Sequence, residues 1–266
     1  MSEWSGMVSI RPLYPHPAML VEEERTGLKR AYLVVSDLHI GFEAMLNSRG
    51  VIVDSKYSLN TMLEELRDLI RSTQLDGVIL LGDVKSSIRS ISKQEWNEVP
   101  EFFRTVSGYA NIYLIPGNHD TNIRFLLPQN INIMSVKGMV LEETLLVHGH
   151  AMPSSARATI KRIVMGHIHP VFSRGNSVLN GRRIWLYLKV RREKIFPGTE
   201  GTLDIVIVPS FNKEVPAMLV RKRNTKSISP IINRALEYNA IKRALVVTLD
   251  GSIVADDNNV VARLLS

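Results

Sequence analysis

Five short apolar runs, each followed by polar residues, constrain this sequence more than any other feature. The runs are rich in Val, Ile and Leu, and they are AYLVVS (31–36), DGVILLG (76–82), NIYLIPG (111–117), TLLVHG (144–149) and RIVMGH (162–167). Runs of this length and composition predict buried strands of a largely parallel or mixed sheet. Because open α/β sheets place ligands beyond the carboxyl ends of their strands, the polar residues there are candidates for a site.

Helical patterns separate the first runs. Apolar residues recur at helical spacing in SLNTMLEELRDLIRS (58–72), which predicts an amphipathic helix. A second helix is expected over SKQEWNEVPEFFRTV (92–106), although Pro100 weakens that prediction. The order of elements in this half is therefore βαβαβ.

The second half has a different character. Strand-like segments follow one another at 182–190, 202–210 and 244–250, with basic and Pro/Gly-containing loops between them. We find no internal repeat, no low-complexity tract and no clear linker. The predicted fold class is α/β, with two packed sheets and helices outside, in one domain over residues 1–266. Its motif core is expected at 31–170 and its strand-rich half at 171–266.

Composition excludes several classes of protein. The chain has no cysteine, so disulfides, zinc fingers and thiol nucleophiles are excluded. No apolar segment approaches the ~18 residues of a membrane span, and the N-terminus lacks the pattern of a signal peptide. We therefore expect a soluble protein of the cytoplasm with no membrane partner.

The charge balance favours acidic partners. The formal net charge is +7, and basic residues gather in LKVRREK (188–194) and VRKRNTK (220–226). A positive field attracts polyanions such as nucleic acid. Two solvated loops explain these stretches equally well.

The polar residues after the five runs form a set with one chemistry. They are Asp37, His39, Asp83, Asn118, His119, His148, His167 and His169. Nitrogen and oxygen ligands without sulfur suit Mn, Fe or Zn better than Ca or Mg. Even seven ligands from this set are too many for one ion and about right for two that share a carboxylate, an arrangement that serves phosphoester hydrolysis. Each motif alone has a plain structural explanation, a turn or a hydrogen-bonded core histidine, but five in order are a strong signal.

The pattern D-x-H … GD … GNH-[DE] … H … GH-x-H, over residues 37–169, resembles the calcineurin-like metallophosphoesterases. SDLHIG (36–41) looks most like the branch related to the SbcD-type nucleases. Within that branch it is most similar to small archaeal phosphoesterases and to a bacterial phosphoesterase associated with DNA ligase and an Lhr-type helicase. VPSFN (208–212) is similar to a segment of the same branch. The resemblance implies a four-layer α/β sandwich.

The resemblance also implies a role for each residue. One metal would be held by Asp37, His39, Asp83 and His169. Asp83 would bridge to a second metal, whose other ligands would be Asn118, His148 and His167. His119 would act beside the metals as a general acid or by stabilising charge in the transition state, and His150 would contact substrate phosphate or have a structural role. Asp120 would orient nearby groups or cap a turn. Mn is the expected metal, with Fe, Zn, Ni and Co as alternatives.

The sequence departs from the protein-phosphatase branch after the second motif. That branch has GD-x-x-D-R-G, whereas this chain has GDVKSS, with Ser86 at the Asp position and Ser87 at the Arg position. A serine cannot supply the carboxylate that orients the catalytic histidine. A phosphoprotein phosphatase is therefore disfavoured, and what orients His119 is left open.

Three functions remain as hypotheses. The first is a two-metal phosphodiesterase acting on nucleic acid, with a role in DNA repair. The second is a phosphodiesterase for cyclic nucleotides or other small diesters. The third, less favoured because all seven ligand positions are filled, is a non-catalytic scaffold that docks a helicase or DNA ligase. The oligomeric state is open, and a homodimer would be one way for a small member to shape its groove.

Overall fold

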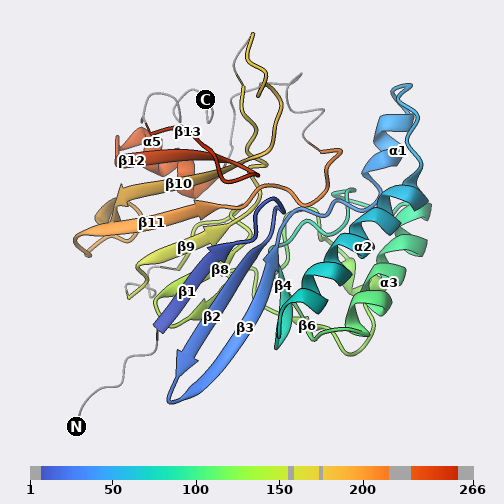
Figure 1. Cartoon of the computed structure of the whole chain (residues 1–266), viewed down its shortest axis with the longest axis horizontal. Helices are drawn as coiled ribbons and strands as arrows, with labels where there is room; N and C mark the ends of the chain where they lie inside the picture. The colour runs from blue at the N-terminus through green and yellow to red at the C-terminus, as the bar shows by residue number, and fades with distance from the viewer. Residues whose placement is uncertain (1–6, 155–158, 174–175, 216–228, 257–266) are drawn as a thin grey trace.

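Two β-sheets pack face to face, and helices cover their outer faces (Figure 1). The chain is seen in a computed structural model that describes residues 7–154, 159–173, 176–215 and 229–256. Both sheets mix parallel and antiparallel pairs. The α/β fold class is confirmed.

The first sheet has six strands in sequence order. They are β1 (Met7–Pro12), β2 (Met19–Arg25), β3 (Leu28–Val35), β4 (Gly77–Leu80), β5 (Ile112–Leu114) and β6 (Asn132–Ile133). The pairs from β3 to β6 are parallel, as the alternation of strands and helices predicted. The antiparallel strands β1 and β2 at the edge were not predicted.

Three helices alternate with strands of the first sheet along the chain. Helices α1 (Phe42–Asn47) and α2 (Ser55–Ser72) come between β3 and β4, and α3 (Lys93–Ser107) comes between β4 and β5. Both predicted helices are confirmed, and Pro100 lies inside α3. Ser92 and Glu95 form a capping box that starts α3, which stabilises its first turn. The apolar faces of α2 and α3 bury Leu66, Phe102 and Phe103 against the sheet.

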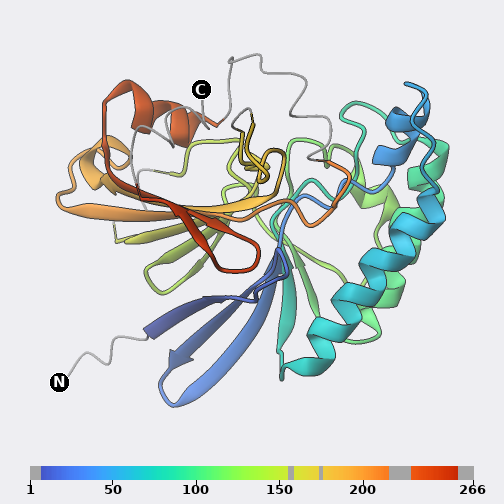
Figure 2. The ribbon, with the colours of Figure 1, turned by 45° about the horizontal axis from the view of Figure 1, so that its top comes forward.

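The second sheet has seven strands in the order β13-β12-β10-β11-β9-β8-β7. Their bounds are β7 (Met139–Leu141), β8 (Thr144–Val147), β9 (Arg162–Met165), β10 (Ile184–Arg191), β11 (Thr202–Ile207), β12 (Ile241–Thr248) and β13 (Ile253–Ala255). Helix α5 (Pro230–Glu237) lies on the side of this sheet away from the first sheet (Figure 2). Strands β8, β9 and β11 are mutually parallel.

Three apolar cores separate the layers. One lies between the first sheet and its helices, one on the outer face of the second sheet, and one between the two sheets. The middle core includes Met19, Val164 and the buried Trp185. Helix, sheet, sheet and helix are therefore stacked as the four layers of the expected sandwich.

The structure shows only one of the two basic stretches. The first, 188–194, is not a solvated loop: residues 188–191 are the end of β10, where Leu188 and Val190 are buried, and Arg192–Lys194 form a short 3-10 helix. Apolar and basic residues alternate there, so the charges point away from the core. The stretch 220–226 lies outside the described residues. No helix within the described ranges is long and apolar enough to cross a membrane.

Candidate metal centre

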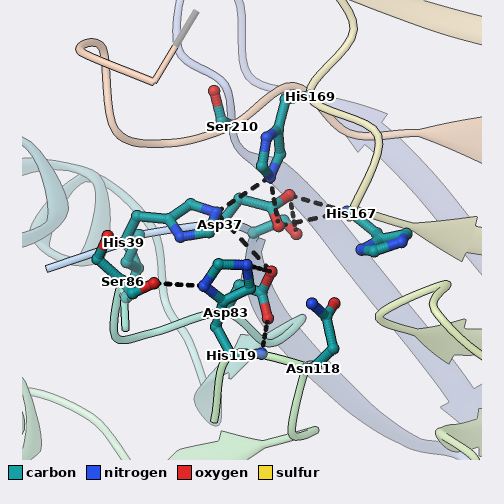
Figure 3. A network of polar contacts seen from close by, with 12 residues as sticks. Asp37, His39, Asp83, Ser86, Asn118, His119, His167, His169 and Ser210 are labelled. Atoms are coloured by element: carbon teal, nitrogen blue, oxygen red, sulfur yellow. Dashed lines mark hydrogen bonds and ion pairs between the residues drawn. The ribbon is translucent and has the colours of Figure 1, made fainter. Parts of the chain in front are cut away.

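The predicted site residues meet where parallel strands of the two sheets end. Asp37 and His39 follow β3, and Asp83 follows β4. Asn118 and His119 follow β5, whereas the remaining histidines follow β8 and β9 of the second sheet. Figure 3 shows Asp37, His39, Asp83 and His169 close together, with Asn118, His119 and His167 around them. All five predicted motifs are thus brought to one place.

Tight turns hold most of the candidate ligands. Five of them have a positive φ: Asp37 (58°), His39 (43°), Asp83 (52°), His167 (70°) and His169 (48°). Residues other than glycine rarely adopt this conformation, and it persists only where the surroundings enforce it. Such strain gathers at functional sites, so its presence at these positions supports a shared role.

Two glycines let the ligand loops approach one another. A Cβ on Gly117 would lie 2.2 Å from Oδ1 of Asp83, and a Cβ on Gly166 would lie 2.6 Å from Oδ2 of Asp37. Both distances are shorter than any allowed contact. The loops can therefore pack only if GNHD and GHIH have glycine at these positions. The reason is the lack of space for a Cβ, not only a preference of turns for glycine.

A first cluster of donor atoms is formed by Asp37, His39, Asp83 and His169, whose ligand atoms all lie within 4.8 Å of one another. His169 Nε2 lies 3.1 Å from both His39 Nε2 and Asp37 Oδ1. Two ligands held at right angles about 2.1 Å from one ion would be separated by about 3 Å. The donor atoms of this cluster therefore fit a divalent ion.

A second cluster contains Asp83, His148 and His167. His148 Nε2 lies 3.3 Å from Asp83 Oδ2, 3.1 Å from His167 Nδ1 and 3.2 Å from Asn118 Oδ1. Asp83 belongs to both clusters, so it is the residue that could serve two metal sites. The structure thus brings together the two groups of side chains that the family resemblance implied, with Asn118 beside the second cluster through its contact with His148.

Burial and mutual contact shift the pKa values of these groups. Burial raises the pKa of Asp83, but His148 and other histidines more than offset this, so the pKa lies below its ordinary value. Burial and the neighbouring His169 lower the pKa of His39 to about 3. Burial opposes the charged form of His148, yet Asp83 and Asp37 raise its pKa to about 9. Ionised carboxylates and a neutral His39 are the forms that bind metal, whereas His148 must release a proton to do so.

The two clusters differ in what orients their imidazoles. His148 Nδ1 donates to the carbonyl oxygen of Leu81 at 2.7 Å, which turns its Nε2 toward the second cluster. His39 Nδ1 is buried and makes no hydrogen bond to any described residue. In the first cluster Ser36 Oγ lies 2.7 Å from Asp37 Oδ2 and donates to it. Each cluster thus has a hydrogen bond from outside that fixes one of its candidate ligands, a histidine in the second cluster and an aspartate in the first.

His119 lies beside both clusters. Its backbone N–H donates to Asp83 Oδ1 at 2.8 Å, and its Nε2 lies 3.9 Å from Asp83 Oδ2. Its Nδ1 donates to the carbonyl oxygen of Ser86 (Figure 3). The side chain is 24% exposed, so a bound substrate can reach it. This position suits proton transfer at the edge of the metal centre.

His150 and Asp120 have clear positions as well. The ring of His150 lies 5.2 Å from that of His148, and its buried Nδ1 has no hydrogen-bond partner in the described part of the chain. Asp120 is buried and accepts hydrogen bonds of 2.8 Å from the N–H groups of Gly117 and Val84. Asp120 therefore ties together the loops that carry Asn118 and Asp83.

The segment 208–214 carries contacts that the sequence did not reveal. Asn212 is buried, and its side-chain amide donates to the carbonyl oxygens of Leu38 at 3.0 Å and His39 at 3.5 Å. Phe211 N–H donates to the carbonyl oxygen of Ser36 at 2.8 Å. The resemblance of VPSFN to other sequences was the only signal, and it assigned no role. The segment holds the turn that presents Asp37 and His39.

Comparison with known proteins places the chain in a family. The family model described as calcineurin-like phosphoesterase matches residues 31–207, more than half of the chain. No sequence match was found among curated proteins. The solved structure of nuclease MPE from Pseudomonas putida is similar at 20% identity and a TM-score of 0.45, over 77% of this chain and 87% of that one. From the family match, this chain belongs to the calcineurin-like phosphoesterases.

Proposed function

We propose that the chain is a two-metal phosphodiesterase whose substrate is nucleic acid. Enzymes of the family use a dinuclear site for divalent metals, and this chain has two donor clusters that fit such ions. The observation that carries the proposal is the position of Asp83 in both clusters, because a shared carboxylate is what holds two ions at the short spacing used for phosphoester hydrolysis.

The proposal assigns the metal ligands as the motifs predicted. Asp37, His39, Asp83 and His169 hold one ion, and Asp83, Asn118, His148 and His167 hold the other, in a chain that acts as one domain. Divalent ions bound there, Mn first and Fe, Zn, Ni or Co as alternatives, supply Lewis-acid stabilisation of phosphate charge and lower the pKa of water. The convergence of all seven side chains disfavours the scaffold hypothesis.

His119 is proposed as the general acid. With Nδ1 bonded to a carbonyl oxygen, Nε2 is the ring atom that faces the centre. A proton on Nε2 can pass to the leaving oxygen of the substrate while Nδ1 keeps its own proton. His150, whose ring lies 5.2 Å from that of His148 beside the second cluster, is proposed to contact a substrate phosphate.

Nucleic acid is the favoured substrate class because the net charge is +7 and the SDLHIG motif resembles the nuclease-related branch. We place the chain in the small branch that includes the phosphoesterase associated with DNA ligase and an Lhr-type helicase. A cytoplasmic role in DNA repair, with a helicase or ligase as partner and a homodimer as the active form, belongs to the same proposal.

An activity panel with Mn tests the substrate class. Single-stranded DNA, RNA, cyclic nucleotides and aryl mono- and diesters are compared at equal concentration. We expect nucleic-acid cleavage that Asp83→Asn abolishes and His119→Ala strongly reduces, with the exposed Asp68→Asn as a control of equal charge change. Full activity of the Asp83 variant would contradict the shared-carboxylate mechanism.

Salt dependence separates a polymeric substrate from a small one. Binding of a polyanion weakens steeply with added salt because counterions are released from the phosphate backbone. We expect the KM for DNA to rise with salt much more than the KM for an aryl diester. Equal salt dependence, together with better turnover of cyclic nucleotides, would identify a small-molecule phosphodiesterase instead.

A further inference from the structure

The loop after Asp83 contains a buried framework that metal binding does not require. Lys85 has no exposed surface although its side chain ends in an ammonium group. Its Nζ donates to the carbonyl oxygens of Ser87 and Ser90, the latter at 3.2 Å. Burial of a lysine is costly and lowers its pKa, so a role that needs these two contacts is expected.

Glu95 supports the same loop from α3. This residue is fully buried, and its Oε1 accepts from Ser87 N–H at 2.6 Å, while Oε2 accepts from Ser92 N–H at 2.6 Å. Lys85 thus binds carbonyl groups of the loop, and Glu95 binds its amide groups. A further hydrogen bond of 3.0 Å runs from Ser86 N–H to the carbonyl oxygen of Ile40.

Together these contacts leave little freedom to the peptide group of Ser86. Its carbonyl oxygen accepts the hydrogen bond from His119 Nδ1 (Figure 3). A carbonyl oxygen can only accept, so Nδ1 must carry a proton and Nε2 must face the centre. The ring is therefore oriented although residue 86 has no carboxylate.

We propose that Lys85 and Glu95 are positioning residues that hold the Ser86 carbonyl oxygen as the acceptor for His119, in place of the missing aspartate. The inference rests on the proposed function in one respect, the role of His119 as general acid. Because the acceptor is neutral, it fixes the direction of the ring without adding a negative charge beside Asp83. In the imidazolium form, with a proton on each ring nitrogen, Nε2 gives its proton to the leaving oxygen, and the ring is left as the Nδ1–H tautomer, still bonded to Ser86.

The tautomer of His119 gives a test that needs neither metal nor turnover. Two-bond ¹H–¹⁵N spectra of the metal-free protein distinguish a ring protonated on Nδ1 from one protonated on Nε2, and the chain has only seven histidines. The His119→Gln spectrum assigns the signal. We expect the Nδ1–H tautomer in the native chain, and a mixture of tautomers in Lys85→Met and in Glu95→Gln.

Two control variants make the test specific. Ser86→Ala removes the hydroxyl but keeps the backbone carbonyl, so the tautomer should be retained. Arg89→Met removes a cation from an exposed position of the same loop and should also retain the tautomer. Loss of the tautomer in Ser86→Ala would overturn the assignment, since it would mean that the hydroxyl is the acceptor. Should Lys85→Met fail to fold, Glu95→Gln still decides the matter, because it keeps the size of the side chain.

Kinetics with Mn and a dinucleotide diester, whose alkoxide leaving group needs a proton, provide the second measurement. General acid catalysis contributes roughly 100- to 10,000-fold, so partial loss of orientation in Lys85→Met should lower kcat about tenfold with little change in KM. An unchanged tautomer and an unchanged kcat in both variants would refute the positioning role. An inactive native chain that still shows the Nδ1–H tautomer would count against the proposed function and leave the orientation by Ser86 intact.

Discussion

The two metal clusters are built from the same kinds of residue but are held in different ways. In the second cluster the ring of His148 is oriented directly, by its hydrogen bond to the carbonyl oxygen of Leu81. In the first cluster His39 has no such bond within the described residues, and the backbone that carries it is held instead by Asn212. The second cluster therefore depends on the orientation of a side chain, and the first on the position of a backbone turn.

Substitution of the shared ligand should have the largest effect. Asp83→Asn weakens both clusters, so we expect loss of both ions and a fall in hydrolysis of at least about 1,000-fold, equal to about 4 kcal/mol. His169→Gln touches the first cluster alone and should leave one ion per chain. Metal content after dialysis and aryl diester hydrolysis measure both effects. Two retained ions in Asp83→Asn would contradict the division into clusters that share a carboxylate.

A glycine between the clusters should come next. Gly166 precedes His167 of the second cluster, and a Cβ there would lie 1.7 Å from Ser36 Oγ, next to Asp37 of the first. Gly166→Ala should therefore lower the free energy of unfolding by about 3 kcal/mol and weaken metal binding at both clusters. Urea denaturation with EDTA isolates the packing effect from metal binding. Gly108→Ala, with negative φ and no Cβ contact below 3.3 Å, is the control and should change stability little.

Substitution of Asn212 should affect the first cluster and leave the second unchanged. Asn212→Ala removes the amide that holds the turn of Leu38 and His39, so the affinity of the first cluster should fall about 10- to 100-fold while the second is unchanged. Titration calorimetry with Mn, or with Zn where heats are small, resolves the two binding events.

Asn212→Asp serves as the companion variant. An aspartate keeps an acceptor for Glu214 N–H but cannot donate to the two carbonyl oxygens. It should lose affinity as the alanine variant does. Native affinity in Asn212→Asp would mean that the contact with Glu214 is the one that matters.

Much of the fold could be predicted because the residues that become buried are spaced regularly along the sequence. The apolar runs that became β3, β4, β5, β8 and β9, and the helical spacing that became α2, are local signals. The places of the candidate ligands in the fold were predictable for the same reason, since each follows a run. The alternative of a solvated loop at 188–194 was wrong for residues 188–191, because Leu188 and Val190 alternate with basic residues and are core residues of β10, in agreement with the strand predicted at 182–190.

The remaining features depend on contacts between distant segments. Asn212 acts on Leu38, which lies 174 positions away, and no local pattern announces such a pair. From the sequence, Ser86 suggested that nothing orients His119, because a carboxylate side chain was expected at that position. The acceptor is a backbone carbonyl oxygen, a group that every residue carries and that residue type therefore cannot reveal.

Ser36→Ala should have the smallest effect and therefore tests the comparison most sharply. The Ser36 hydroxyl is fully buried and lies 2.7 Å from Asp37 Oδ2 and 3.1 Å from the carbonyl oxygen of Leu81. Loss of one such hydrogen bond costs about 1 kcal/mol, or roughly fivefold in the dissociation constant of the first ion. Ser107→Ala, at the exposed end of α3, should change nothing. An effect of Ser36→Ala as large as that of Asn212→Ala would show that the first cluster also depends on side-chain orientation, and the distinction between the clusters would then fail.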